Sequence, residues 1–457
     1  MRAKGAALLA LVLLNAGCAI EPDKTVQEAT NRPAEMAAAT WAATGVIADV
    51  ENGWIGSFAS AQLSSLVNEA LENNLNLQAL AANVEQSQAL ARQAGAALVP
   101  SVSVSGSSGR SGLSESGRSR ASYDVGLAVS WELDMWGRLR SGVEQAQASA
   151  QAAEADYLFA QYSVAANTAI AYFAAIDAAT QVDVARLSLD LLEKTLRITN
   201  VRYDEGMASA QELALARADI AATRDQQLAR EGAMRNALRA LELLLGRYPA
   251  ADIDVSGGLP ELPAPPPAGL PSELLERRPD LVAAERQVAA AFNAVTQARA
   301  AQLPQISLTS SLGGASGDLS QLLNPGNVAW SIGANLLAPL YDGGRLRENV
   351  TIANAQQSAV LASYGEAALR AFSEVETALD QQQVLMARQA EQQIALAEAE
   401  RAFALAEAQY AEGEISLVDL LGFQQRVIQN RSVFESTRRL GLDNRVQLHL
   451  ALGGAWE

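Results

Sequence analysis

The stretch Gly137-Arg138-Leu139-Arg140 occurs a second time as Gly344-Arg345-Leu346-Arg347, 207 residues later in the chain. At the same offset, Tyr203-Asp204-Glu205-Gly206 matches Tyr410-Ala411-Glu412-Gly413. Matches at one fixed offset indicate that two tandem copies of one structural unit build the chain, and such a repeat has to be identified before a fold is assigned.

The sequence divides into five parts. We place repeat one at 61–248 and repeat two at 270–454. The proline-rich stretch 249–269 between them is typical of a stiff, extended linker. A weakly patterned lead-in at 18–60 precedes repeat one, and residues 1–17 resemble a signal peptide.

Each repeat is predicted to contain a β-hairpin, at 101–133 in repeat one and at 305–338 in repeat two. Large apolar residues alternate there with small or polar ones, and a period of two indicates strands with one apolar face. The apolar positions are Val102, Val104, Tyr123, Val125, Leu127, Val129, Trp131, Ile306, Leu308, Leu312, Trp330, Ile332, Ala334 and Leu336.

A long helical hairpin is predicted after each β-hairpin, at 138–246 and at 345–453. From Arg138 to Arg202 there is no proline and one glycine, and an unbroken helix of this length would extend about 97 Å. Apolar residues on heptad spacing predict a coiled-coil seam in this helix. The seam positions are Val184, Leu187, Leu191, Ile198 and Val201. The fold class is therefore mainly helical with a small β part.

Composition narrows the function classes. The formal net charge of −17 argues against a nucleic-acid partner, because phosphates would be repelled. One cysteine and one histidine leave no disulfide framework and too few ligands for a typical zinc site. The histidine, His449, falls late in a predicted helix and is expected to be a packing or surface residue rather than a base. No phosphate-binding loop is present. We therefore expect no enzymatic activity, no cofactor and no metal.

The only cysteine lies at the end of the signal-like segment. Arg2 and Lys4 precede an apolar run, and small residues then lead to Cys18. This arrangement predicts that Cys18 becomes the acylated first residue of a lipoprotein. Asn15 departs from the usual leucine three residues before such a cysteine. The alternative is a plain secretory signal in which Cys18 is incidental.

The predicted strands have the length and alternation of membrane β-strands. Closed membrane barrels need at least eight strands, and open strand edges cannot be satisfied in lipid. One chain supplies four strands, so three chains would supply twelve. A small antiparallel sheet in a soluble helical protein is the alternative.

Several motifs together resemble outer-membrane efflux proteins of the TolC type, in the lipoprotein (NodT-like) branch that serves resistance-nodulation-division pumps. The motifs are Trp131-Glu132-Leu133-Asp134-Met135-Trp136-Gly137-Arg138, Arg278-Pro279-Asp280-Leu281 with Glu285, Leu340-Tyr341-Asp342-Gly343-Gly344-Arg345 and the two Tyr-x-x-Gly-x-x-Ser turns. The resemblance implies a homotrimer with a twelve-stranded β-barrel in outer-membrane lipid, which continues into a helical barrel in the periplasm. It also implies two partners, a periplasmic adaptor (membrane fusion) protein and an inner-membrane efflux transporter.

The first group of candidate site residues marks the change from strand to helix. Tryptophans there predict either an aromatic girdle at the membrane interface or packing at the junction. Glycines permit the change of backbone direction. Arginines are candidate partners of Asp134 and Asp342, although a solvated surface charge is the commoner arrangement. The group comprises Trp131, Trp136, Gly137, Arg138, Gly344 and Arg345.

The second group marks the turns of the helical hairpins. Glycine allows a left-handed turn there, and the following serine can cap the return helix. The resemblance adds that these tips dock on the adaptor. The group comprises Tyr203, Gly206, Ser209, Tyr410, Gly413 and Ser416.

Val418 and Asp419 form a third group, a candidate periplasmic aperture. The resemblance implies that apolar and acidic rings close the channel near this tip. Gly422 stands where an aspartate is common in the family, so Val418 and Asp419 are the candidates for those rings. The alternative for Asp419 is a first-turn carboxylate favoured by the helix dipole.

The leading functional hypothesis is a passive outer-membrane exit duct for drugs or other small compounds. Within the same fold, the exit channel of a type I protein-secretion system is a second hypothesis. A third, of a different class, is a soluble periplasmic coiled-coil scaffold, in which the four strands would have no membrane role.

Overall fold

The computed structural model describes residues 25–26, 28, 30–31, 35, 37–43, 52–112 and 119–456. The predicted signal peptide and Cys18 lie outside these residues. The chain forms two compact units. The first comprises Met1–Met36, Ala82–Ala155 and Val282–Ala367, and the second comprises Ala37–Ala81, Asp156–Leu281 and Ala368–Glu457. Each unit therefore draws on both halves of the sequence.

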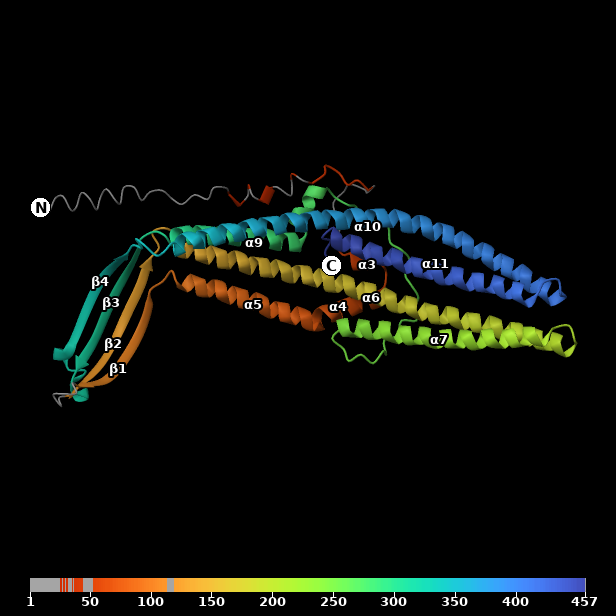
Figure 1. Ribbon diagram of the computed structural model, residues 1–457, viewed down its shortest axis with the longest axis horizontal. Helices are drawn as coiled ribbons and strands as arrows, with labels where there is room; N and C mark the ends of the chain where they lie inside the picture. The colour runs from red at the N-terminus through yellow and green to blue at the C-terminus, as the bar shows by residue number, and fades with distance from the viewer. Residues whose placement is uncertain are drawn as a thin grey trace. The chain divides into compact units, whose positions relative to one another are not determined.

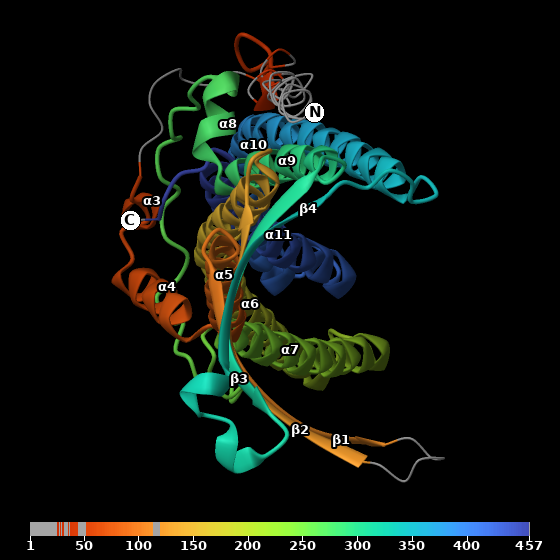
Figure 2. The same ribbon diagram turned by 90° about the vertical axis from the view of Figure 1, so that its left-hand side faces the viewer.

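The first unit contains one antiparallel sheet in the order β1-β2-β3-β4 (Figure 1). The strands are β1 (Ser101–Gly112), β2 (Ser119–Leu133), β3 (Gln305–Ser316) and β4 (Val328–Leu337). The sheet is strongly curved, as Figure 2 shows along β3. The two β-hairpins, which lie far apart in the sequence, are joined through the pairing of β2 with β3.

The strand register places the apolar positions of all four strands on one face. Val104 pairs with Leu127, Leu127 with Leu312, and Leu312 with Trp330. The next row, on the opposite face, contains Ser103, Ala128, Ser311 and Ser331. On the apolar face Val104 and Trp330 are each 74% exposed, so the described residues leave these side chains largely uncovered.

Four helices adjoin the sheet in sequence. They are α5 (Leu75–Ala96), α6 (Arg138–Asp204), α9 (Pro279–Ala300) and α10 (Arg345–Glu412). α9 begins with a proline at its first position, where the missing N–H costs no helical hydrogen bond. α6 contains 67 residues and α10 contains 68, each without an internal proline. In the first unit, Val288 and Phe292 of α9 are buried with Tyr364 of α10.

The second unit pairs α7 (Ala210–Leu244) with the distal part of α6, and α11 (Leu417–Ala451) with that of α10 (Figure 1). Its main core combines alanines with a few large side chains, among them Leu63, Phe173, Leu241 and Val446. Short elements complete the fold. They are α3 (Trp54–Ser57), α4 (Ala61–Asn73), α8 (Leu274–Arg277), η1 (Pro271–Glu273), η2 (Leu319–Gln321) and η3 (Pro325–Asn327).

The proline-rich linker is fixed to the helices of the second unit. The buried Arg445 of α11 donates to the carbonyl oxygen of Pro263. The indole N–H of Trp41 lies 3.1 Å from the carbonyl oxygens of Ala268 and Gly269. The linker is thus tied both to α11 and to the segment that precedes the first repeat.

None of the helices in the described part of the chain is both long enough and apolar enough to cross a membrane.

Candidate functional site

The change from strand to helix is organised by two aspartates. Asp134 accepts hydrogen bonds from the backbone N–H groups of Leu139 and Arg140, each at 2.9 Å, in the first turn of α6. Burial by itself would raise the pKa of Asp134, but these N–H groups and the Arg140 side chain outweigh it and hold the pKa below its usual value. Asp342 accepts in the same way from the N–H groups of Gly344 and Leu346 at the start of α10, at 3.0 and 2.9 Å.

Arg138 neither pairs with its candidate partner Asp134 nor remains a solvated surface charge. Arg138 instead forms a two-pronged ion pair with Glu132 of β2, with Nη2 lying 2.7 Å from each carboxylate oxygen. Asp134 is occupied by the free N–H groups of α6 and by the Arg140 side chain at 3.1 Å. Arg345 does lie near Asp342, but at 3.9 Å.

Gly137 and Gly344 have the backbone conformation that the junction requires. Their φ angles are +76° and +92°, in the region that side chains disfavour. Nothing lies within 4 Å of a Cβ built on Gly137, so its glycine is required by the backbone and not by a close neighbour.

The tryptophans at the junction hold the incoming chain segments. The indole N–H of Trp131 donates to the carbonyl oxygen of Leu98 at 3.0 Å, just after α5. That of Trp136 donates to the carbonyl oxygen of Pro304 at 2.6 Å, just before β3. Both are half-buried, whereas Trp330 of β4 is 74% exposed. The described contacts therefore give Trp131 and Trp136 a packing role, and leave Trp330 exposed on the apolar face.

The tips of the two helical hairpins are built alike. Gly206 and Gly413 have φ angles of +77° and +85°. Each return helix then begins with a reciprocal cap, in which the serine hydroxyl accepts from a backbone N–H and the carboxylate three residues later accepts from the serine N–H. The caps pair Ser209 with Glu212 and Ser416 with Asp419.

The two tip tyrosines occupy different environments, although the repeat treats them as equivalent. Tyr203 is 42% exposed, whereas Tyr410 is 1% exposed. The Tyr410 hydroxyl lies 3.0 Å from the hydroxyl of Thr199, and the Arg202 guanidinium stacks over its ring at 4.8 Å. Tyr410 therefore joins α10 to α6 and presents no surface.

The candidate aperture residues are both exposed at the second tip. Val418 is 62% exposed. Hydrogen bonds from the Ser416 hydroxyl and backbone N–H lower the pKa of Asp419, so its carboxylate is ionised while it caps α11. Gly422 has nothing within 4 Å of a built Cβ, so a larger side chain fits at that position.

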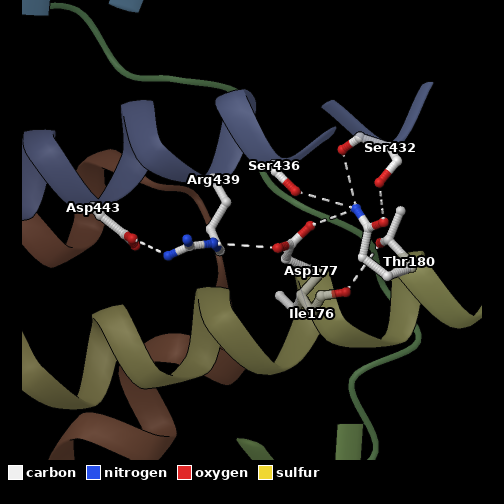
Figure 3. A network of polar contacts seen from close by, with 8 residues as sticks. Ile176, Asp177, Thr180, Ser432, Ser436, Arg439 and Asp443 are labelled. Atoms are coloured by element: carbon white, nitrogen blue, oxygen red, sulfur yellow. Dashed lines mark hydrogen bonds and ion pairs between the residues drawn. The ribbon is translucent and has the colours of Figure 1, made fainter. Parts of the chain in front are cut away.

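A polar network joins α6 to α11 in the second unit (Figure 3). Arg439 lies between two carboxylates, with Nε 3.3 Å from Asp177 and an ion pair to Asp443. The Gln181 amide donates to Asp177, to the Ser432 carbonyl oxygen and to the Ser436 hydroxyl at 3.2 to 3.3 Å. Burial raises the pKa of Asp443 to about 6, opposed by Arg439 and reinforced by the charge of Asp177.

A second network surrounds Arg278, whose side chain is 4% exposed. It bonds to both carboxylate oxygens of Asp280, at 3.0 and 2.8 Å, and to Glu374 of α10 at 2.5 Å. Arg278-Pro279-Asp280-Leu281 carries part of the family resemblance but is not among the candidate site residues predicted from the sequence. The spacing of Arg278 and Asp280 could have indicated an ion pair between them. The contact of Arg278 with Glu374 of α10 is long-range, and sequence spacing does not reveal it.

Neither network contains a histidine or a cysteine. Within the described residues, no three histidine, cysteine, aspartate or glutamate side chains lie close enough together to hold a metal ion. His449 is 6% exposed and stacks on Trp54, and burial together with Arg445 lowers its pKa to about 4. The candidate site residues and the two networks form helix caps and contacts between helices.

A curved sheet with one exposed apolar face and two free edges, joined to long helical hairpins, defines the class of outer-membrane channel subunits. The family model described as outer membrane efflux protein matches the chain twice, at residues 66–247 and 270–454. The chain therefore belongs to the outer membrane efflux protein family. Members form homotrimeric channels that work with a periplasmic adaptor and an inner-membrane transporter.

Individual relatives resemble the chain over nearly its whole length. The pyoverdine export outer membrane protein OpmQ of Pseudomonas aeruginosa is 33% identical over 417 residues, which cover 88% of this chain and 87% of OpmQ. The cation efflux system protein CusC of Escherichia coli is 30% identical over 446 residues, or 96% of each chain. The open state of the MtrE outer membrane channel of Neisseria gonorrhoeae superposes with a TM-score of 0.84 at 26% identity, covering 96% of this chain and 99% of MtrE.

Proposed function

We propose that three copies of this chain close their sheets into one twelve-stranded barrel, the outer-membrane exit of an efflux pump. The observation that supports this most directly is the register, which unites four strands into one sheet with an apolar face and two unpaired edges, β1 and β4. In lipid such edges have to be paired. Pairing β4 of one subunit with β1 of the next satisfies every edge once the ring closes.

The duct is passive in this proposal, and the inner-membrane transporter supplies the energy. The chain acts as a conduit and has no enzymatic role, which agrees with its membership of a channel family. The efflux duct accounts for the family assignment by itself, so neither alternative function, the protein-secretion channel or the periplasmic scaffold, has to be invoked. Acylated Cys18 adds a lipid anchor to a subunit that the barrel already holds in the membrane.

The helical tips are the proposed contact with the adaptor. Tyr203 and Met207 are 42% and 60% exposed and offer apolar surface at the first tip. The tips are shaped by the turn glycines Gly206 and Gly413 and by the capping serines Ser209 and Ser416. The buried Tyr410 packs beneath the second tip, against α6. Val418 and Asp419 are the proposed lining of the closed aperture.

Cargo selection is assigned to the pump and not to the barrel. Hydroxyl groups, glycine and alanine occupy the middle of the polar face of the sheet, and the charged side chains of that face, Asp124, Glu132 and Arg120, lie toward the ends of β2. OpmQ and CusC, relatives of similar identity, are named for pyoverdine and for cations. Sequence identity of about 30% therefore does not indicate which compound this chain exports.

The test uses the purified full-length protein in detergent and in planar bilayers. Light scattering should give the mass of three chains, and the same sample should produce discrete conductance steps. A monomer without conductance would contradict the proposal. A trimer without conductance would support the assembly but overturn the duct.

A further inference from the structure

One arginine lies on the apolar face of the sheet. β1 pairs with β2 without interruption from Ser101 opposite Ser130 to Gly112 opposite Ser119. Because no residue is inserted, alternate residues of β1 keep the same face throughout. Arg110 therefore shares the face of Val102 and Val104.

The position of Arg110 along the strand is that of the outer headgroups. On β2, the apolar face extends from Leu133 to Tyr123, about 34 Å along the strand. At the usual tilt of membrane strands this span is about 25 Å tall, the height of the apolar band of a barrel. Ser108 pairs with Tyr123 and Arg110 pairs with Ala121, so Arg110 lies one step beyond the band. The opposite ends of the strands lead to the periplasmic helices, so Arg110 lies on the outer side.

The local chemistry fits a phosphate. Arg110 is exposed, and its Nε donates to the hydroxyl of Ser119 at 3.0 Å, which directs the guanidinium along β2. Among the described residues it forms no ion pair. The two terminal nitrogens remain for a further acceptor, and a planar guanidinium can bind two oxygens of one phosphate group. On a chain of net charge −17, this cation on the lipid-facing side is complementary to an anionic headgroup.

We propose that Arg110 and Ser119 form a binding site for the phosphorylated glycolipid of the outer leaflet, the lipid A class. The site lies on each subunit, so a trimer carries three. The proposal depends on the outer-membrane location of the chain and is independent of whether the duct conducts.

The test is a titration of lipid A into the detergent-solubilised trimer, with bound lipids counted by native mass spectrometry. Arg110→Gln should weaken binding about tenfold, the scale of a charge-assisted contact. Arg110→Lys should retain part of the affinity, because the charge remains. Lipid A without its phosphates should bind the wild type no better than intact lipid A binds Arg110→Gln.

Arg120→Gln is the matched control. Arg120 pairs with Ser111, one residue from Arg110 in height but on the opposite face of the sheet. Its variant should bind lipid A like the wild type. Equal losses in Arg110→Gln and Arg120→Gln would overturn the site. Equal affinity for phosphatidylglycerol would overturn its assignment to lipid A. Conductance of the same Arg110→Gln sample should be unchanged, which separates this proposal from that of the duct.

Discussion

At the scale of single residues, local chemistry was predictable and pairing across the junction was not. The caps by Ser209 and Ser416 follow from a serine placed just after a turn glycine, and both are present. The pairing of Arg138 could not be deduced, because Asp134 precedes α6 and its carboxylate is taken up by free N–H groups of the first turn. Arg138 then turns back to Glu132, a contact that depends on the left-handed conformation of Gly137.

Asp443→Asn should reduce the pH dependence of stability. The pKa of the Asp443 carboxyl is about 6 in the folded chain against an ordinary value of 3.8, so the folded state binds this proton more tightly. Its contribution to the free energy of unfolding therefore falls as the pH rises from 3.8 to about 6. The variant should lack this component, about 2–3 kcal/mol, when helical signal is followed in denaturant at several pH values. The exposed Asp183→Asn is the control. An unchanged slope in Asp443→Asn would contradict the assignment.

Cys18→Ser should abolish fatty-acid labelling, because Cys18 is the only cysteine in the chain. Trimers should still assemble, since the barrel provides most of the apolar burial in the membrane. Intact mass before and after the substitution measures the lipid. Wild-type protein without added lipid mass would show that Asn15 was the better guide and that the signal is a plain secretory one.

At the scale of elements, alternation predicted the strands well, while heptad spacing placed the helical seam less well. Val201, counted in the seam, is 58% exposed, whereas Thr195 and Thr199 are at most 5% exposed. Each threonine hydroxyl donates to the carbonyl oxygen four residues earlier, at 3.0 and 2.9 Å. This hydrogen bond satisfies the hydroxyl and lowers the energetic cost of burying it. A pattern that counts only apolar residues cannot find such positions.

Leu127→Asp should destabilise the assembled barrel. Leu127 lies in the middle of the apolar row between Val104 and Leu312, where a carboxylate would meet hydrocarbon. We expect a loss of about 2 kcal/mol, near the lower end of the range for charged residues at mid-bilayer. Ser130→Asp, on the opposite face, should be mild. Denaturant unfolding in vesicles provides the measurement, and equal losses at the two positions would refute the assignment of faces.

At the scale of the whole molecule, the repeat was visible in the sequence but the division into compact units was not. Both units take a portion of each repeat, because α6 and α10 each contribute residues to the two of them. Matching motifs identify equivalent positions and carry no information about which positions meet. Tyr203 and Tyr410 illustrate this, because they are equivalent in sequence but only Tyr410 packs against the neighbouring helix, α6.

The double variant Val418→Ala with Asp419→Ala should raise single-channel conductance in planar bilayers. If these residues line the closed aperture, their removal widens it and weakens block by divalent cations, which clustered carboxylates attract. Gln211→Ala with Glu212→Ala is the matched control, because Glu212 provides the same cap in the first hairpin. Removing either cap costs about 1 kcal/mol, so loss of the cap alone affects both variants alike. If the variant at Val418 and Asp419 conducts like the wild type, or if the variant at Gln211 and Glu212 changes conductance more, the channel closes at another place.

The free edges at β1 and β4 have a consequence for cells that express two alleles of this gene. In the proposed trimer each edge is completed by a neighbouring subunit, so a chain that folds its helices but cannot pair one edge would still enter assemblies and leave them open. When such a chain and the wild type are made in equal amounts and mix at random, only about one assembly in eight is free of it. Edge defects are therefore dominant, whereas a chain that never folds merely halves the supply.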